Sequence, residues 1–295
     1  MAETGKAKTI TIISGKGGTG KTSVTAAFAS LAAPVVVADC DVDAANLHLL
    51  LSPTVKNTVE FYAMPAARIN QDLCTGCGTC HDLCRYEAIL VDDDKYTVDS
   101  LGCEACLVCK ENCPEQAIEA VERLAGHWYL SQARTGPMVH ASLGIAQENS
   151  GKLVTEVRKA AAEVAESNGL GMVLVDGPPG IGCAVMASLT GADLVIAVTE
   201  ATQSGLKDLM RVHDLCQHFK IPIHIIINKC DLNPDVTNTV RQWAKGKNAP
   251  IIGEIPYDTA FTKAMIEGKT IVEYKSSRIG DRLKEMWQEV VHTLA

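Results

Sequence analysis

Eight of the twelve cysteines in this 295-residue chain fall into two short blocks with the same internal spacing. They are Cys74, Cys77, Cys80 and Cys84 in the first block and Cys103, Cys106, Cys109 and Cys113 in the second. Each cysteine of the second block lies 29 residues after its counterpart, so the segment is an internal repeat. Structural disulfides are rare inside cells, and clustered thiolates there usually ligate metals. The repeat therefore predicts two metal sites.

Each block reads Cys-x2-Cys-x2-Cys-x3-Cys, which resembles the spacing of bacterial ferredoxins that hold two [4Fe–4S] clusters. In that family the fourth cysteine of each run reaches the other cluster. The resemblance implies one cluster on Cys74, Cys77, Cys80 and Cys113, and another on Cys103, Cys106, Cys109 and Cys84. Paired zinc sites are the alternative, since Cys-x2-Cys is also a zinc spacing, but zinc does not require this longer run twice.

A phosphate-binding loop is predicted near the start of the chain. A β-branched strand over 8–14 leads into Gly15-Lys16-Gly17-Gly18-Thr19-Gly20-Lys21-Thr22, and an alanine-rich helix follows. This G-x4-G-K-T pattern is typical of a P-loop, whose backbone N–H groups surround phosphates. Lys21 is expected to reach the β- and γ-phosphates, and Thr22 to offer its hydroxyl to Mg²⁺. A flexible surface turn would leave the Lys-Thr pair unexplained.

The additional lysine, Lys16, makes this loop similar to the deviant Walker A motif of the MinD/ParA/nitrogenase iron-protein ATPases. In that family the early lysine reaches across a dimer to the partner's nucleotide. The resemblance therefore implies an ATP-dependent homodimer, with Lys16 and Lys21 both catalytic. A solvated loop lysine is the alternative interpretation of Lys16.

Later segments resemble other motifs of the same family. The run Asp39 to Asn46 is similar to switch I, which implies that Asp41 orients the attacking water. The run 173–180 is similar to Walker B and switch II, which implies that Asp176 holds Mg²⁺, directly or through a water, and that Gly180 approaches the γ-phosphate. For the base side, the resemblance implies contacts from Asn228, Pro256 and Asp258.

The alternation of strands and helices predicts a doubly wound, mostly parallel α/β sheet with nucleotide at the strand carboxyl ends. The cysteine repeat interrupts it. We expect a discontinuous P-loop ATPase domain over 1–63 and 121–295, and an inserted α+β ferredoxin-like domain over 64–120.

Cys183 lies seven residues after Asp176, at an offset where the nitrogenase iron protein has a cluster ligand. The family resemblance makes it a candidate switch-coupled metal contact, and a small buried residue is the alternative.

Composition excludes several classes of protein. A formal net charge of −8, from 27 basic and 35 acidic residues, argues against a nucleic-acid binder. No apolar run approaches a membrane span, and the chain starts without an apolar signal core, so a cytoplasmic location is expected. The final helix, over 278–294, mixes acids with bases, unlike a membrane-surface helix.

Together these patterns predict an ATP-hydrolysing dimeric switch that uses ATP/ADP, Mg²⁺ and two [4Fe–4S] clusters. The family resemblance favours iron–sulfur or metallocofactor assembly, with a metalloprotein, an apo-acceptor or a redox partner. Two alternatives are an ATP-gated electron donor resembling the nitrogenase iron protein and a ParA/MinD-like positioning ATPase with redox-sensing clusters.

Overall fold

The computed structural model describes residues 6–93, 95–144, 150–274 and 278–294. The chain divides into two compact units. The first unit consists of the chain up to Val59, Trp128–Ser142 and the residues from Ser150 onward. The second unit consists of Glu60–His127 and Leu143–Asn149. The second unit extends a few residues beyond the expected insert at each end. Residues 1–5, which begin the segment used to judge the signal core, lie outside the described residues.

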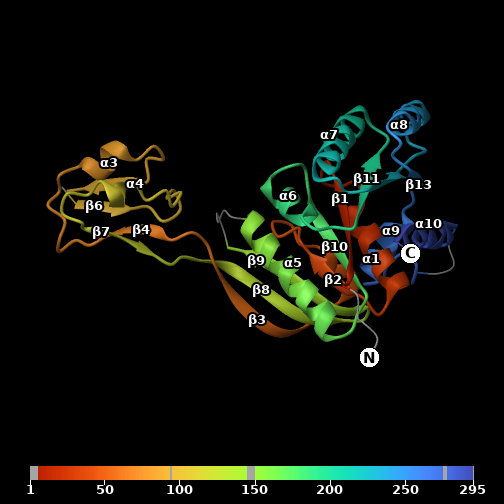
Figure 1. The fold of residues 1–295 in the computed structure, drawn as a ribbon, viewed down its shortest axis with the longest axis horizontal. Helices are drawn as coiled ribbons and strands as arrows, with labels where there is room; N and C mark the ends of the chain where they lie inside the picture. Colours follow the sequence, from red (N-terminus) through yellow and green to blue (C-terminus); the bar gives the residue numbers. More distant parts are fainter. Residues whose placement is uncertain (1–5, 94, 145–149, 275–277, 295) are drawn as a thin grey trace. The chain divides into compact units, whose positions relative to one another are not determined.

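A nine-stranded sheet has the order β13-β12-β11-β1-β10-β2-β9-β8-β3 (Figure 1). The strands are β1 (Lys8–Ser14), β2 (Val36–Asp39), β3 (Thr54–Tyr62), β8 (Leu124–Ala133), β9 (Gly136–Leu143), β10 (Met172–Pro179), β11 (Leu194–Glu200), β12 (Ile223–Asn228) and β13 (Ile251–Ile255). Every pairing from β13 across to β9 is parallel. The prediction of a mostly parallel α/β sheet is confirmed, and its central strands are apolar because both faces are covered.

Helices accompany the sheet, and some of them begin at side-chain caps. They are α1 (Lys21–Ala32), α2 (Leu47–Leu51), α5 (Ser150–Ser167), α6 (Cys183–Leu189), α7 (Gln203–Phe219), α8 (Pro234–Gly246), α9 (Ala260–Ile266) and α10 (Arg278–Leu294). At the start of α7, Thr202 Oγ1 accepts a 3.0 Å hydrogen bond from the Gly205 N–H. At the start of α8, Asn233 Oδ1 accepts a 3.1 Å bond from the Val236 N–H, and Pro234 occupies the first turn. Such caps satisfy N–H groups that have no partner within the helix.

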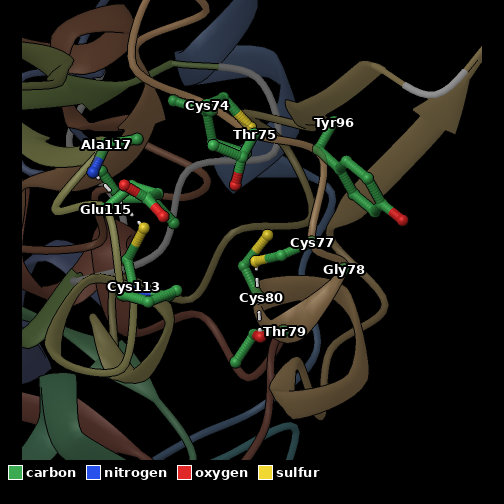
Figure 2. Close-up of a pocket in the computed structure, with 13 residues that line it drawn as sticks. Cys74, Thr75, Cys77, Gly78, Thr79, Cys80, Tyr96, Cys113, Glu115 and Ala117 are labelled. Atoms are coloured by element: carbon green, nitrogen blue, oxygen red, sulfur yellow. Dashed lines mark hydrogen bonds between the residues drawn. The ribbon is translucent and has the colours of Figure 1, made fainter.

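The second unit contains two small antiparallel sheets and two short helices. One sheet pairs β4 (Ala66–Ile69) with β7 (Ile118–Val121), and the other pairs β5 (Ile89–Asp92) with β6 (Lys95–Val98). The helices are α3 (Thr79–Leu83) and α4 (Val108–Glu111). Cys77 lies two residues before α3, and Cys80 is the second residue of the helix (Figure 2).

The sequence repeat is also a repeat of backbone conformation. Gly76 and Gly78 have φ values of 72° and 78°, and their counterparts Ala105 and Leu107 have 55° and 56°. Left-handed backbone is unusual for alanine and leucine, so the second block retains a turn for which the first block uses glycine. The two blocks therefore form the same turn with different residues.

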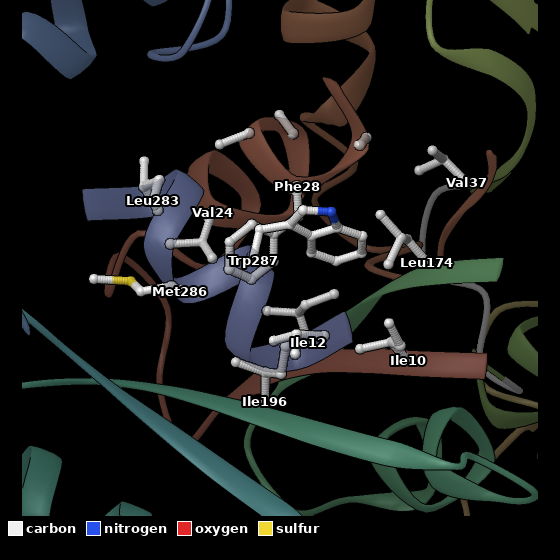
Figure 3. Packing of buried hydrophobic residues seen from close by; sticks show 14 of the residues in the cluster. Ile10, Ile12, Val24, Phe28, Val37, Leu174, Ile196, Leu283, Met286 and Trp287 are labelled. Atoms are coloured by element: carbon white, nitrogen blue, oxygen red, sulfur yellow. The ribbon is translucent and has the colours of Figure 1, made fainter. Parts of the chain in front are cut away.

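The first unit is held together by apolar side chains on both faces of the sheet. Ile10 and Ile12 of β1 face one buried core with α1 and α10, whereas Ile13 faces the other core with α6, α7 and α8. This follows from the two-residue period of a strand. In the first core the rings of Phe28 and Trp287 lie 5.2 Å apart (Figure 3). The final helix is therefore part of the core.

Among the described residues, no helix is both long and apolar enough to cross a bilayer.

Candidate functional site

The predicted phosphate loop lies where a parallel sheet usually binds ligands, between the end of β1 and the start of α1. Gly18 and Gly20 have φ values of 79° and 93°, a left-handed conformation that glycine adopts without steric cost. The hydroxyl of Thr19 is buried and has no hydrogen-bond partner among the described residues. A bound phosphate or water would satisfy it, so the loop fits an anion.

Lys21 is surrounded by acids. Its Nζ atom lies 3.0 Å from Asp176 Oδ1 and 3.5 Å from Asp41 Oδ2, and the side chain is only 6% exposed. Burial alone would lower the pKa of Lys21, but the two carboxylates outweigh it and raise the pKa. Lys21 is therefore charged at neutral pH, as a phosphate-binding lysine must be.

Asp176 connects the two nucleotide motifs. Its Oδ2 accepts a 2.8 Å hydrogen bond from Thr22 Oγ1, and its Oδ1 accepts a 2.7 Å bond from Thr25 Oγ1. A threonine hydroxyl beside a carboxylate is the donor set that P-loop proteins use for Mg²⁺. The structure thus brings together the residues that the sequence assigned to magnesium, although they come from β10 and α1.

A third acid, Asp39, is fully buried and organises the segment that resembles switch I. It accepts bonds from the N–H groups of Asp41 at 3.2 Å and Leu47 at 3.3 Å. Burial, together with the charge of Asp176, raises the pKa of Asp39. Burial also raises the pKa of Asp41, against the opposing charge of Lys21. Three carboxylates around one lysine make a site that favours an added cation.

Asn228, at the end of β12, holds the phosphate loop from the side. Its Nδ2 donates to the Thr19 carbonyl at 2.7 Å, and its Oδ1 accepts from the Lys229 N–H at 2.9 Å. These two bonds leave a second hydrogen on Nδ2 and a second lone pair on Oδ1 unused. The expected adenine contact stays a prediction.

The other predicted base-side residues lie just after β13. Pro256 follows the strand, and Asp258 Oδ1 accepts a 2.7 Å hydrogen bond from the Ala260 N–H at the start of α9. Gly180 has a φ of 94° and donates its N–H to the Ser14 carbonyl at 2.9 Å, so the segment resembling switch II touches β1. Their contacts with nucleotide are untested.

Lys16 has partners that the sequence did not indicate. Its ammonium forms an ion pair with Glu200 and lies 3.3 Å from the hydroxyl of Ser204. Glu200 also pairs with Lys229 at 3.1 Å. The Lys16 side chain is still 33% exposed, so its action across a dimer stays a prediction beside the alternative of a solvated loop lysine.

Cys183 begins α6 and is exposed. The alternative of a small buried residue is therefore wrong. A metal contact stays a prediction.

The second site is a cavity in the cysteine-rich unit (Figure 2). Cys74, Cys77 and Cys80 of the first block line it together with Cys113 of the second block. The Ala117 N–H lies 3.3 Å from the sulfur of Cys113, and in the other block the Ala88 N–H lies 3.4 Å from the sulfur of Cys84. N–H groups that point at sulfur stabilise thiolate charge.

The remaining predicted ligands lie in the same unit. Cys103 and Cys109 pack against its small core with Cys84, whereas Cys106 is exposed. Among the described residues, no group of three or more His, Cys, Asp or Glu side chains is arranged to hold a metal ion. The thiols of the first set line one cavity without converging on a single ion.

The chain is similar to a known family and to solved structures. The family described as CobQ/CobB/MinD/ParA nucleotide binding domain matches residues 10–271. An uncharacterised protein of Methanocaldococcus jannaschii is 30% identical over 287 residues, which cover 95% of each chain. The septum site-determining protein MinD of Pyrococcus horikoshii, solved with Mg-ADP, has a TM-score of 0.60 at 20% identity, with 98% of each chain covered. A MinC:MinD cell division complex of Aquifex aeolicus gives 0.56 at 18% identity, with 97% and 96% covered.

Proposed function

Because the chain belongs to the CobQ/CobB/MinD/ParA nucleotide-binding family, whose MinD and ParA members are ATPases, we propose that ATP drives it as a dimeric switch. We further propose that its cysteine-rich unit holds two [4Fe–4S] clusters. The first proposal rests on the acids and threonines around Lys21, and the second on the cysteine cavity.

In the ATPase site each group has a separate task. Lys21 and the loop N–H groups would bind the phosphates, while Thr22 and Asp176 would hold Mg²⁺. Asp41, 3.5 Å from Lys21, would orient water near the γ-phosphate. Lys16 would act from one subunit on the nucleotide of the other. Catalysis by this set is positioning and charge stabilisation.

The observation that carries the iron–sulfur proposal is the origin of the thiols in the cavity. Cys113 belongs to the second block but lines the cavity with three cysteines of the first. This crossed set is the one that the two-cluster ferredoxin spacing implies. A cluster spreads its four thiolates over the corners of a cube, farther apart than the ligands of one ion, so four thiols that share a cavity without a single-ion arrangement are compatible with the proposal. Such a cluster would supply one-electron redox chemistry to the unit.

Two biological roles are candidates for the ATP-driven switch. The likeness to MinD, including a complex with MinC, favours a ParA/MinD-like positioning ATPase with redox-sensing clusters over the assembly role expected from sequence. Assembly stays the second candidate because Cys77 and Cys106 are exposed, as suits thiols that release a cluster to an acceptor. Either role requires a protein partner.

Iron and sulfide analysis of anaerobically purified protein tests the clusters. We expect about eight iron and about eight sulfide per chain in the wild type, and about half of each in Cys113→Ala. Cys230→Ser, outside both blocks, should retain the full content. Zinc at one or two per chain without sulfide would overturn the proposal in favour of paired zinc sites.

Transfer experiments separate the two roles. The loaded protein is mixed with an apo-protein that accepts a [4Fe–4S] cluster, with and without ATP. Retention of iron together with an ATPase rate that changes on oxidation supports redox sensing. Movement of iron to the acceptor supports assembly.

A further inference from the structure

One carboxylate, that of Glu200, pairs with two lysines of the nucleotide site. One oxygen forms an ion pair with Lys16, and the other lies 3.1 Å from the ammonium of Lys229. Lys16 is also 3.3 Å from Ser204 Oγ, and Lys229 donates to the Gly18 carbonyl at 3.1 Å. The Glu200 side chain is only 14% exposed, so water screens these pairs less than on an open surface.

The sheet order explains why these groups meet. β11 lies between β1 and β12, so the residue at its carboxyl end sits between the loops that follow both neighbours. Glu200 is that residue, and it pairs in register with Asn228 of β12. On the other side, Gly15 packs so closely against Asp208 of α7 that a Cβ would collide with it. The loop that carries Lys16 is therefore closely packed against α7.

In this arrangement Lys16 can depart without leaving the Glu200 carboxylate unpaired. If Lys16 leaves, Glu200 keeps Lys229 as its partner and remains a neutral pair. Besides Glu200, each lysine has one further oxygen partner among the described residues, the Ser204 hydroxyl for Lys16 and the Gly18 carbonyl for Lys229. The departure of Lys16 leaves no unpaired buried charge, which would otherwise be costly.

We propose that Glu200 is a positioning residue that retains Lys16 within its own subunit and releases it when nucleotide in a partner subunit offers phosphate charge. This rests on the proposed function, in which Lys16 acts across the dimer. Glu200 thereby sets the nucleotide concentration at which the dimer closes, because each subunit must give up this ion pair to close. The free energy of a partly exposed ion pair is large enough to change this nucleotide concentration about three- to tenfold.

The test is dimerisation by light scattering during titration with AMP-PNP, a non-hydrolysable ATP analogue. We expect Glu200→Gln to lower the concentration for half-maximal dimer about three- to tenfold. Glu200→Asp keeps the charge on a shorter side chain. Its concentration for half-maximal dimer should lie between those of Glu200→Gln and the wild type. In a Lys16→Ala background, Glu200→Gln should change nothing further, since the ion pair is already absent.

Asp193→Asn is the matched control, because Asp193 pairs with Lys8 at the opposite end of β1. It should leave the threshold unchanged, and all variants should unfold within a few degrees of the wild type. An unchanged or raised threshold in Glu200→Gln would overturn the role of Glu200. If Lys16→Ala itself dimerises like the wild type, the cross-dimer function of Lys16 fails, and the role of Glu200 fails with it.

Discussion

Thr22 Oγ1 donates a 2.8 Å hydrogen bond to Asp176 Oδ2 across 154 residues of sequence. The bond occupies the hydroxyl and a carboxylate oxygen, the two groups expected at a magnesium ion. Thr25 binds the other carboxylate oxygen at 2.7 Å, which orients Asp176 independently of any metal. The groups predicted to hold magnesium are therefore already in contact, and a magnesium ion between them would displace the Thr22–Asp176 hydrogen bond.

Lys21→Ala should reduce ATP turnover at least about 100-fold, because the variant loses the charge that stabilises the transferring phosphoryl group. It also leaves Asp176 and Asp41 without the cation 3.0 and 3.5 Å away. Phosphate release measures the effect. Lys8→Ala, at the start of β1 and 51% exposed, should stay within about twofold of wild type. Turnover that survives in Lys21→Ala would refute the P-loop assignment.

Asn228→Ala should weaken ATP binding about tenfold, because the Thr19 carbonyl loses its 2.7 Å donor and the phosphate loop loses its lateral support. A buried group left unpaired costs about 1–3 kcal/mol. Fluorescent-nucleotide titration gives the dissociation constant. Asn238→Ala on the exposed face of α8 is the control and should bind normally. Equal affinities in the two variants would show that the Asn228 bond does not support the loop.

The features of the site that could be predicted from the sequence are local patterns of residues. The glycine loop and the cysteine spacing each lie within a dozen residues, and their chemistry follows from residue type. The Lys16–Glu200 ion pair could not be predicted from the sequence. An acid at the end of β11 contacts the phosphate loop only because β11 lies beside β1 in the sheet. Similarly, 136–143 forms β9 beside β2, a placement that only long-range pairing decides.

Lys220→Gly should raise the free energy of unfolding by about 1 kcal/mol. Lys220 ends α7 with a φ of 57°, where a side chain is strained and glycine is not. The following N–H, of Ile221, still bonds the Cys216 carbonyl at 3.0 Å, so the cap itself is kept. Thermal unfolding measures the change. Lys247→Gly, at an α8 cap with a φ of −102°, should be neutral or destabilising. Equal effects would refute the explanation.

Glu273 should make the free energy of unfolding depend on pH. Hydrogen bonds from the Arg134 guanidinium, at 2.8 and 2.7 Å, lower the pKa of Glu273 to about 2, and Thr270 adds to the effect. The folded state therefore binds this proton more weakly than the unfolded chain, whose glutamate has a pKa near 4.5. The contribution is complete above about pH 4.5 and is lost as the pH falls toward about 2.

Denaturant unfolding between pH 3 and pH 7 measures this contribution in wild type and Glu273→Gln. The difference in unfolding free energy should be about 1 kcal/mol at pH 7, allowing for screening of a pair that is about one-third exposed, and should shrink at pH 3. Glu267→Gln is the control, because its pair with Lys269 is about half exposed and should have little pH-dependent effect. A Glu273→Gln difference that stays constant with pH would show that the ion pair does not couple folding to protonation.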